Sequence, residues 1–505
     1  MRKLFLVFVP SFLFFSCQKI EYETIIHNAM IYDGSGSAPY EADIGINADT
    51  IAFIGDLKNG KAKNELDAKG LDLAPGFIDT HSHHAGGLFQ HRNSLAAISQ
   101  GLTTIIIGQD GDSNFPLARF FQQVSDTPVA VNIGSYCGHN TLRDSILGKD
   151  FKRTATQDEI EKMKSLLKQD MEAGAFGLST GLEYDPGIYS NADEVLQLAT
   201  EVAPYGGRYI SHIRSEDRFF WKAIDEIINI GKVAKIPVQV SHIKLAMHKL
   251  WGKSDSLLML LDNARKNGVN ITSDIYPYAF WHSTIRVLFP DRNFSNEKEA
   301  ELILKEITLP EDIILSSYEL QPEYEGRSLA TIARLENKTP ARMLTELIAK
   351  IENFEKENKR SCDEGILATS MNDDDVKKLM QWPQANICSD GSASGGHPRG
   401  YGAFTRVLGH YAREEKIFTL QEAIHKMTGL SAEHMGIKGR GLIKKGYCAD
   451  LVLFDPNKVS DQATVGEPHK ISEGIEVVWV NGKQVFKNGK TTGVYPGVII
   501  KRNNK

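Results

Sequence analysis

The chain has 505 residues, of which 41% are hydrophobic and 24% are charged, so it contains enough apolar residues for a large buried core. Its formal net charge of −6 gives no electrostatic reason to expect nucleic acid binding. The length is compatible with two to four domains or with one α/β barrel that carries additions.

The beginning of the chain predicts an export signal. A basic start, Arg2-Lys3, precedes the apolar run 4–15, which is shorter than the roughly 20 residues that span a bilayer. Cys17 follows a small residue, as at a bacterial lipoprotein cleavage site, although phenylalanines replace the usual leucine and small residue upstream. We expect residues 1–16 to be a lipoprotein signal peptide and Cys17 to anchor an exported protein to the membrane of the bacterial cell envelope. The alternative is a plain secretory signal.

The segments at the two ends of the chain predict a small β domain. Residues 17–72 contain short β-branched runs separated by tight turns, and residues 436–505 have the same character. We expect these segments to form one β-sandwich built from both termini.

Residues 73–435 alternate short apolar runs with amphipathic helical stretches, such as 191–203, 219–234 and 254–267. This alternation is typical of an α/β fold, a (β/α)8 TIM-like barrel, whose active site lies at the carboxyl ends of its strands. Residues 286–362 are charged and helix-rich and match no barrel unit, so we expect an insertion before the last strand that covers the barrel mouth. The predicted strands are residues 73–79, 103–109, 128–135, 175–180, 208–213, 237–243, 270–275 and 386–390.

The motif Pro75-Gly-Phe-Ile-Asp-Thr-His-Ser-His83 ends the first predicted strand. Because side chains alternate along a strand, His81 and His83 point to the same face. Two imidazoles side by side suit a divalent metal ion, although the motif alone could be an accidental pair on a solvated turn.

Four more residues of metal-ligand type end other predicted strands. Asp110 follows the second strand, His212 the fifth, His242 the sixth and Asp390 the eighth. Any one of them could be a structural residue, but six such residues at one barrel mouth are a much stronger signal. The set could hold one or two Zn²⁺ or other divalent ions.

These motifs resemble the amidohydrolase superfamily and, within it, the N-acyl-D-amino-acid deacylases (D-aminoacylases), over about residues 22–500. The first and last motifs mark the superfamily, whereas the segments 179–190, 211–216 and 389–399 are specific to this branch. The resemblance implies zinc at His81, His83, His212, His242 and Asp390.

The chain departs from the family at one expected ligand. The family has a cysteine in a Gly-x-Cys-Gly context, whereas this chain reads Gly108-Gln-Asp-Gly111, which places Asp110 where the thiolate would be. A carboxylate can bridge two ions but is harder than sulfur and binds zinc less strongly. The number and identity of the metal ions therefore stay open.

The resemblance also implies a mechanism, the hydrolysis of a linear amide. A bound metal lowers the pKa of its water towards ~7, and the resulting hydroxide attacks the amide carbonyl. We expect Asp390 to take the proton of that water and to return it to the departing amine.

The resemblance further implies which residues hold the substrate, a small N-acylated amino acid. Arg399 offers a planar fork for its α-carboxylate. Tyr184, Lys244, Tyr276 and Ser283 join Arg399 around the carboxylate and the acyl group, with Ser283 one residue further along than the family spacing.

Three other functions are alternatives to this one. A cyclic amidase of the hydantoinase or dihydroorotase kind uses a carboxylated lysine from the fourth strand, and Phe176-Gly-Leu-Ser-Thr-Gly181 contains no lysine. A dipeptidase acting on D- or isoaspartyl-type dipeptides would use the same amide chemistry. A non-catalytic, metal-free binding lipoprotein would have kept the barrel without its reaction.

Overall fold

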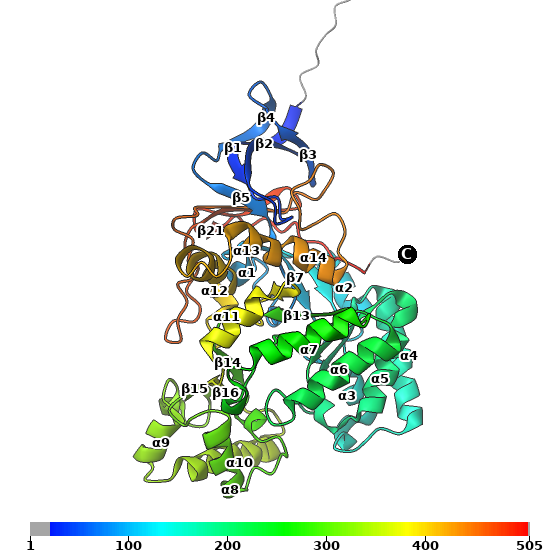
Figure 1. Ribbon diagram of the computed structural model, residues 1–505, viewed down its shortest axis with the longest axis vertical. Helices are drawn as coiled ribbons and strands as arrows, with labels where there is room; N and C mark the ends of the chain where they lie inside the picture. Colours follow the sequence, from blue (N-terminus) through cyan, green and yellow to red (C-terminus); the bar gives the residue numbers. More distant parts are fainter. Residues whose placement is uncertain (1–20, 503–505) are drawn as a thin grey trace, which may run out of the picture.

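The protein is described by a computed structural model, which covers residues 21–502. The small β domain lies at one end of the molecule, the barrel in the middle and the insertion at the other end (Figure 1). The predicted signal peptide, 1–16, and the predicted lipidation site, Cys17, lie outside the described residues. Among the described residues, no helix combines the length and the apolar composition needed to cross a bilayer.

Eight parallel strands with intervening helices form the predicted barrel, and each overlaps its predicted range. Two ladders, β6-β7-β8 and β9-β10-β11-β12-β13-β17, account for the strand pairs. Further hydrogen bonds join the ladders: Phe176 donates to the Ser135 carbonyl at 2.9 Å, and Asp390 donates to the His81 carbonyl at 2.9 Å. The barrel strands are β6 (Phe77–Asp79), β7 (Leu102–Ile107), β8 (Asn132–Ser135), β10 (Gly177–Gly181), β11 (Arg208–His212), β12 (Val238–Val240), β13 (Ile271–Ile275) and β17 (Ala385–Ile387), with the short β9 (Cys137–Gly138) beside β10.

Amphipathic helices cover the outside of the ring, as their apolar spacing predicts. α4, for example, begins with a capping box in which Thr156 and Glu159 satisfy each other's backbone N–H groups. The helices of the barrel layer are α1 (Leu95–Ile98), α2 (Leu117–Asp126), α3 (His139–Leu147), α4 (Gln157–Ala173), α5 (Ala192–Glu201), α6 (Phe220–Ala234), α7 (Ser254–Lys266), α11 (Asp373–Gln381), α12 (Arg399–Arg406), α13 (Leu420–Met427) and α14 (Gly429–Met435).

The first predicted strand, 73–79, is divided at Gly76. Its first part, β5 (Asp72–Pro75), belongs to the terminal sheet, and its second part is β6. At Gly76 the chain passes so close to Thr103 that a Cβ atom would lie 2.1 Å from the Thr103 side chain. The glycine therefore allows the chain to pass directly from one domain into the other.

Both ends of the chain contribute to one nine-stranded sheet, which confirms a β domain built from both termini. β5 pairs antiparallel with β18, so the two ends meet in the middle of the sheet. The sheet curls around a buried apolar cluster that includes Ile26, Leu453 and Trp479. Its other strands are β1 (Glu21–Ile31), β2 (Tyr40–Asn47), β3 (Thr50–Gly55), β4 (Lys61–Asp67), β18 (Leu451–Phe454), β19 (Ile475–Val480), β20 (Lys483–Lys487) and β21 (Lys490–Thr491).

The insertion forms a compact unit with its own apolar core, in green to yellow at the lower left of Figure 1. It extends beyond the predicted range 286–362, because two strands that flank this range pair with each other. Its strands are β14 (Phe280–Ser283), β15 (Ile313–Tyr318) and β16 (Glu364–Thr369), and its helices are α8 (Glu297–Glu306), α9 (Leu329–Leu335) and α10 (Pro340–Asn358).

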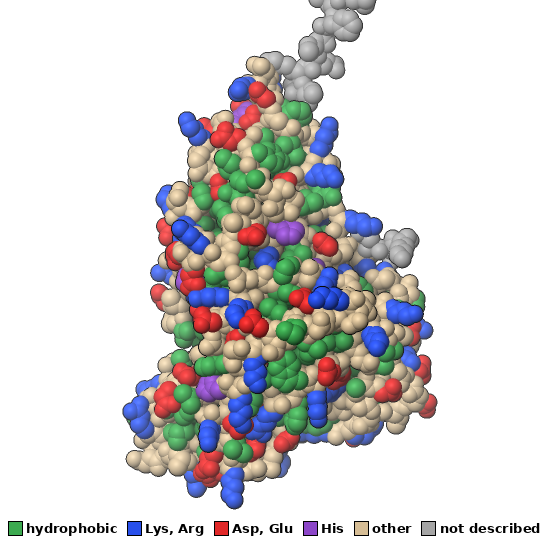
Figure 2. Space-filling model, in the orientation of Figure 1, with side chains coloured by type: hydrophobic (Ala, Val, Ile, Leu, Met, Phe, Trp, Pro, Cys, Tyr) green, Lys and Arg blue, Asp and Glu red, His purple; other side chains and the backbone are tan. Residues whose placement is uncertain are grey.

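Charged side chains of both signs are interspersed over the face shown in Figure 2. No large field of one sign covers this face, in agreement with the small net charge of the sequence.

Candidate metal centre and active site

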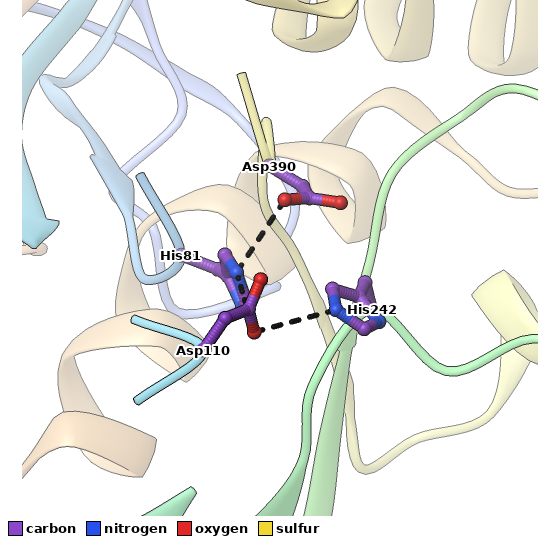
Figure 3. Close-up of side chains that lie close together, drawn as sticks. All are labelled: His81, Asp110, His242 and Asp390. Atoms are coloured by element: carbon purple, nitrogen blue, oxygen red, sulfur yellow. Dashed lines mark ion pairs between the residues drawn. The ribbon is translucent and has the colours of Figure 1, made fainter. Parts of the chain in front are cut away.

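Four of the predicted ligands come together at the carboxyl ends of the barrel strands (Figure 3). The Nε2 atom of His81 lies 3.4 Å from one oxygen each of Asp110 and Asp390. That oxygen of Asp110, Oδ1, also lies 3.5 Å from Nε2 of His242. One ligand atom from each of the four residues fits within a span of 4.8 Å, as a shared ion requires.

The remaining two predicted ligands extend this group. Nε2 of His83 lies 3.3 Å from Asp110 Oδ2 and 3.2 Å from Asp390 Oδ1. Nδ1 of His212 faces Nε2 of His242 at 3.0 Å. All six residues therefore contribute to one continuous cluster, and Asp110 lies between its two halves.

The cluster contains buried polar atoms that lack hydrogen-bond partners. Both ring nitrogens of His81 and Oδ1 of Asp110 are buried and make no hydrogen bond among the described residues. A buried polar atom without a partner is costly, and a divalent cation would satisfy these atoms at once. Nitrogen and carboxylate oxygen donors also fit zinc, so the residues present fit a metal centre.

Three of the clustered residues have left-handed backbone conformations, which non-glycine residues rarely adopt. The φ angles are +52° at Asp110, +34° at His242 and +47° at Asp390. Ser179 holds the turn of Asp110: its hydroxyl donates to the Gly108 carbonyl at 2.6 Å. Such strain persists where the surroundings impose it, and it is concentrated at functional sites.

The charges of the cluster keep its carboxylates ionised. Burial alone would raise the pKa of Asp110, but His81 and His242 hold it well below its usual range. Burial likewise opposes ionisation of Asp390, whose pKa is lowered well below its usual range by Arg399 and the neighbouring histidines. Both side chains are therefore in the form that binds a cation.

Sequence reasoning missed two carboxylates beside the cluster. Glu183 accepts a hydrogen bond from Nε2 of His212 at 3.0 Å and another from the Glu216 backbone at 2.6 Å. The first bond leaves Nδ1 of His212, which faces the cluster, free to bind a metal. Glu216 lies 3.1 Å from Nδ1 of His242. Both glutamates lie in the branch-specific segments 179–190 and 211–216, and this was the signal that could have identified them.

A pocket with a volume of about 330 Å³ opens beside the cluster and is lined by all five predicted substrate-binding residues. Arg399 contacts Asp390 through Nη1 at 2.6 Å and lies 4.6 Å above the ring of Tyr276. Lys244 makes an ion pair with Glu216 at 2.7 Å. Tyr184 and Ser283 complete the predicted set, and Ser283 lies on β14, so the insertion forms one wall of the pocket.

Among the predicted substrate-binding residues, buried polar atoms also lack hydrogen-bond partners in the described part of the chain. They include the Tyr276 hydroxyl and Nε of Arg399. Because buried donors rarely stay unpaired, these atoms are suited to bind a ligand.

Comparison with known proteins gives consistent results. A model of the amidohydrolase family matches residues 64–306 and 374–486, and most of the insertion lies between these stretches. The chain is 33% identical to the D-aminoacylase of Alcaligenes xylosoxydans xylosoxydans, over 95% of this chain and 98% of that protein. It is also 33% identical to the N-acyl-D-aspartate deacylase of the same organism, over 94% of this chain and 94% of that protein. The identity to the N-acyl-D-glutamate deacylase of this organism is again 33%, over 95% of this chain and 97% of that protein.

Solved structures extend this likeness to the fold. A D-aminoacylase crystal structure matches with a TM-score of 0.84 and 31% identity, over 95% of this chain and all of that one. The N-acyl-D-glutamate deacylase of Bordetella bronchiseptica, solved with zinc and a phosphonate inhibitor that mimics the tetrahedral intermediate, matches equally well, with the same score, identity and coverage.

Proposed function

Because this chain belongs to the amidohydrolase family, in the branch of the N-acyl-D-amino-acid deacylases, we propose that it hydrolyses the amide bond of N-acyl-D-amino acids and releases a carboxylate and a D-amino acid. The observation that carries this proposal is the cluster of six metal-ligand side chains beside a pocket that contains Arg399. The protein is thus a hydrolase that acts on linear amide C–N bonds.

We propose Zn²⁺ as the metal, held by His81, His83, Asp110, His212, His242 and Asp390. Support comes from the nitrogen and oxygen donors of this chain and from the zinc in the similar deacylase structure. When bound, a divalent ion supplies Lewis acidity towards the amide carbonyl and a water that ionises near neutral pH. We predict that the site holds one or two ions.

The catalytic proton transfers are assigned to Asp390. Its carboxylate lies 3.4 Å from His81 and 3.2 Å from His83 and is held ionised, so it can accept the proton of the attacking water. The same carboxyl group can then donate the proton to the departing amine nitrogen. The contact with Arg399 at 2.6 Å fixes the orientation of this carboxylate.

Arg399 is assigned to the α-carboxylate of the substrate. A guanidinium has five N–H donors, so Arg399 can hold Asp390 through Nη1 and still bind a carboxylate through its unpaired Nε. Tyr276, Tyr184, Lys244 and Ser283 line the same pocket and are assigned to the carboxylate and acyl group.

An assay of the metal-loaded protein tests the function. It should cover N-acetyl- and N-formyl-derivatives of D- and L-amino acids, and dipeptides. We expect hydrolysis of the D-amino acid derivatives and its loss after exhaustive chelation. Undiminished turnover after chelation would contradict a metal-dependent mechanism, and a preference for dipeptides would favour the dipeptidase alternative.

Two substitutions test the assigned roles. Asp390→Asn should fold and retain metal, measured by elemental analysis, but lose nearly all turnover; an unaltered kcat would remove Asp390 from this role.

Arg399→Met should raise KM for carboxylate-bearing substrates far more than for amide-capped ones. Equal effects on both substrates would contradict the assignment of Arg399.

We also propose that the protein is exported and anchored by a lipid on Cys17. Support comes from the basic start, the apolar run and the small residue before this cysteine. Cys17→Ser should move the protein from the membrane fraction to the soluble fraction of cells. An unchanged distribution between the fractions would contradict lipidation at Cys17.

A further inference from the structure

Two of the similar enzymes are named for an acidic D-amino acid, aspartate or glutamate, whereas the name of the third, D-aminoacylase, specifies no side chain. Sequence identity does not distinguish among them, because it is 33% in all three cases. Resting on the proposed function, we propose that this enzyme takes N-acyl-D-amino acids with a neutral, apolar side chain and rejects those with an acidic one. The composition of the pocket wall and the pairing of its charges support this preference.

Beside His282 and Ser283, the insertion contributes four apolar side chains to the pocket wall. Val287 and Leu288 lie in the short helix Ile285–Leu288, and Ile307 follows α8; all three line the pocket. Trp281 on β14 also lines it, and its indole N–H already donates to the Ser370 hydroxyl at 2.6 Å. These side chains offer contact area to an apolar group and no cation to a carboxylate.

The cations of the pocket are already paired. Among the described residues that line it, Lys244 and Arg399 are the only lysine and arginine. Lys244 is paired with Glu216, and Arg399 is paired with Asp390 and assigned to the substrate's α-carboxylate. A second substrate carboxylate would be buried without a partner, which is strongly unfavourable.

Two histidines near the wall do not supply the missing charge. His397 accepts a hydrogen bond from the Arg399 backbone at Nδ1 and contacts the Phe280 carbonyl through Nε2, a pattern that requires a neutral ring. His282 contacts the Ser316 hydroxyl, and burial together with nearby Arg399 lowers its pKa to about 4. Both rings are therefore uncharged at neutral pH.

Carboxylates at other positions in the pocket act against an acidic side chain. Asp185 and Asp217 both line the pocket. Asp185 pairs with Arg292 at 3.3 Å, and Asp217 accepts a 2.5 Å hydrogen bond from the Ser215 hydroxyl. They add negative charge to this part of the pocket and so disfavour a second substrate carboxylate, Asp217 more than Asp185 because Arg292 offsets the charge of Asp185. The apolar wall, in turn, offers no partner to a cationic side chain.

The decisive measurement is kcat/KM of the metal-loaded enzyme for matched N-acetyl-D-amino acids. We expect the leucine and methionine derivatives to exceed the glutamate and aspartate derivatives by at least about 100-fold. Equal or higher values for an acidic substrate, or for the lysine derivative, would overturn the inference but leave the deacylase function intact. Hydrolysis of none of the D-derivatives would overturn the proposed function and this inference with it.

A pair of variants tests the charge of the wall itself. Val287 is half-buried, so a longer side chain can be accommodated there. Val287→Lys should raise kcat/KM for the D-glutamate derivative relative to the D-leucine derivative about tenfold, whereas the neutral control Val287→Met should leave this ratio unchanged. The same ratio in both variants would contradict the role of the wall. The wild-type ratios decide the proposal even if Val287→Lys does not fold.

Discussion

At the scale of single residues, Asp110 is the most distinctive feature of the site. It lies between the two halves of the cluster, 3.4 Å from His81 and 3.5 Å from His242, in a left-handed conformation. The resemblance to the deacylases placed a cysteine here. Asp110 points into the cluster and is ionised, so a carboxylate of different chemical character stands at this position, and we propose that it binds the metal.

Exchanging this ligand tests its role. Asp110→Cys should raise the affinity for Zn²⁺ about tenfold or more, because a thiolate is a softer ligand that zinc prefers. Competition with a chromogenic chelator measures this affinity. Asp110→Asn is the matched control and should weaken binding. Equal zinc affinities in all three proteins would show that residue 110 does not bind the metal.

Glu183 is predicted to position His212 rather than to take part in the reaction. Glu183→Gln keeps the shape of the side chain but removes the charge that holds the Nε2–H tautomer of His212. We expect zinc affinity, measured by equilibrium dialysis, to fall about 10- to 100-fold, while KM at saturating zinc changes little.

Glu226→Gln is the matched control for this prediction, because Glu226 pairs with Arg214 at 2.8 Å and does not line the pocket. It should leave zinc affinity unchanged. Glu183→Asp should retain part of the affinity. If Glu183→Gln binds zinc as tightly as wild type, Glu183 has no positioning role.

At the scale of elements, the site depends on strand ends and on one inserted unit. The barrel strand ends supply the six clustered side chains, and hydrogen bonds between the segments after β6 and β17 bring His81 and Asp390 together. The insertion supplies the apolar wall and has a separate core. The clustered side chains and the apolar wall are therefore carried by units with separate apolar cores.

This division predicts the effect of weakening the insertion. Phe289 is fully buried in its core, directly after the wall residue Leu288. Phe289→Ala should destabilise this unit by about 3–5 kcal/mol and raise KM, while the metal content stays unchanged. Leu453→Ala, in the core of the terminal sheet, is the control and should leave KM unchanged. Loss of metal from Phe289→Ala would contradict the independence of the two units.

At the scale of the whole molecule, the two ends of the chain are joined in one sheet. Asp72 in β5 lies opposite Phe454 in β18, and Asp455 follows directly. Burial, and then the charge of Asp455, raise the pKa of Asp72 to about 7. An acidic group is thus protonated in the folded protein at a pH where it is ionised in the unfolded chain.

A dependence of stability on pH follows. Between about pH 4 and 7, Asp72 binds more protons in the folded than in the unfolded state, so its contribution to the free energy of unfolding falls as the pH rises. Asp72→Asn removes this loss. Relative to wild type, the variant should therefore gain stability from pH 5 to pH 8, as measured by urea denaturation.

The exposed Asp67 provides the control for this measurement. Hydrogen bonds from Asn28 and Lys69 lower its pKa, so Asp67→Asn should not gain stability relative to wild type over this range. A constant difference between Asp72→Asn and wild type would show that Asp72 ionises normally in the folded protein.

Local patterns in the sequence were sufficient to predict the barrel strands, the β domain at the termini and the six side chains that form the cluster; their binding of a metal ion stays a prediction. Strand alternation and the position of polar residues at strand ends are local properties, and closure of a barrel brings those ends to one mouth. The split of residues 73–79 at Gly76 was not predictable, because it depends on the close approach of Thr103.

Only the tertiary structure decided which groups pair inside the site. The contact of Glu183 with His212, the pairing of Lys244 with Glu216 and the apolar wall of Trp281, Val287, Leu288 and Ile307 join residues from separate elements. The sequence by itself determined which metal-ligand side chains are present and at which strand ends they lie. Which charges remain free for a substrate depends on distances between elements, and no local pattern encodes those distances.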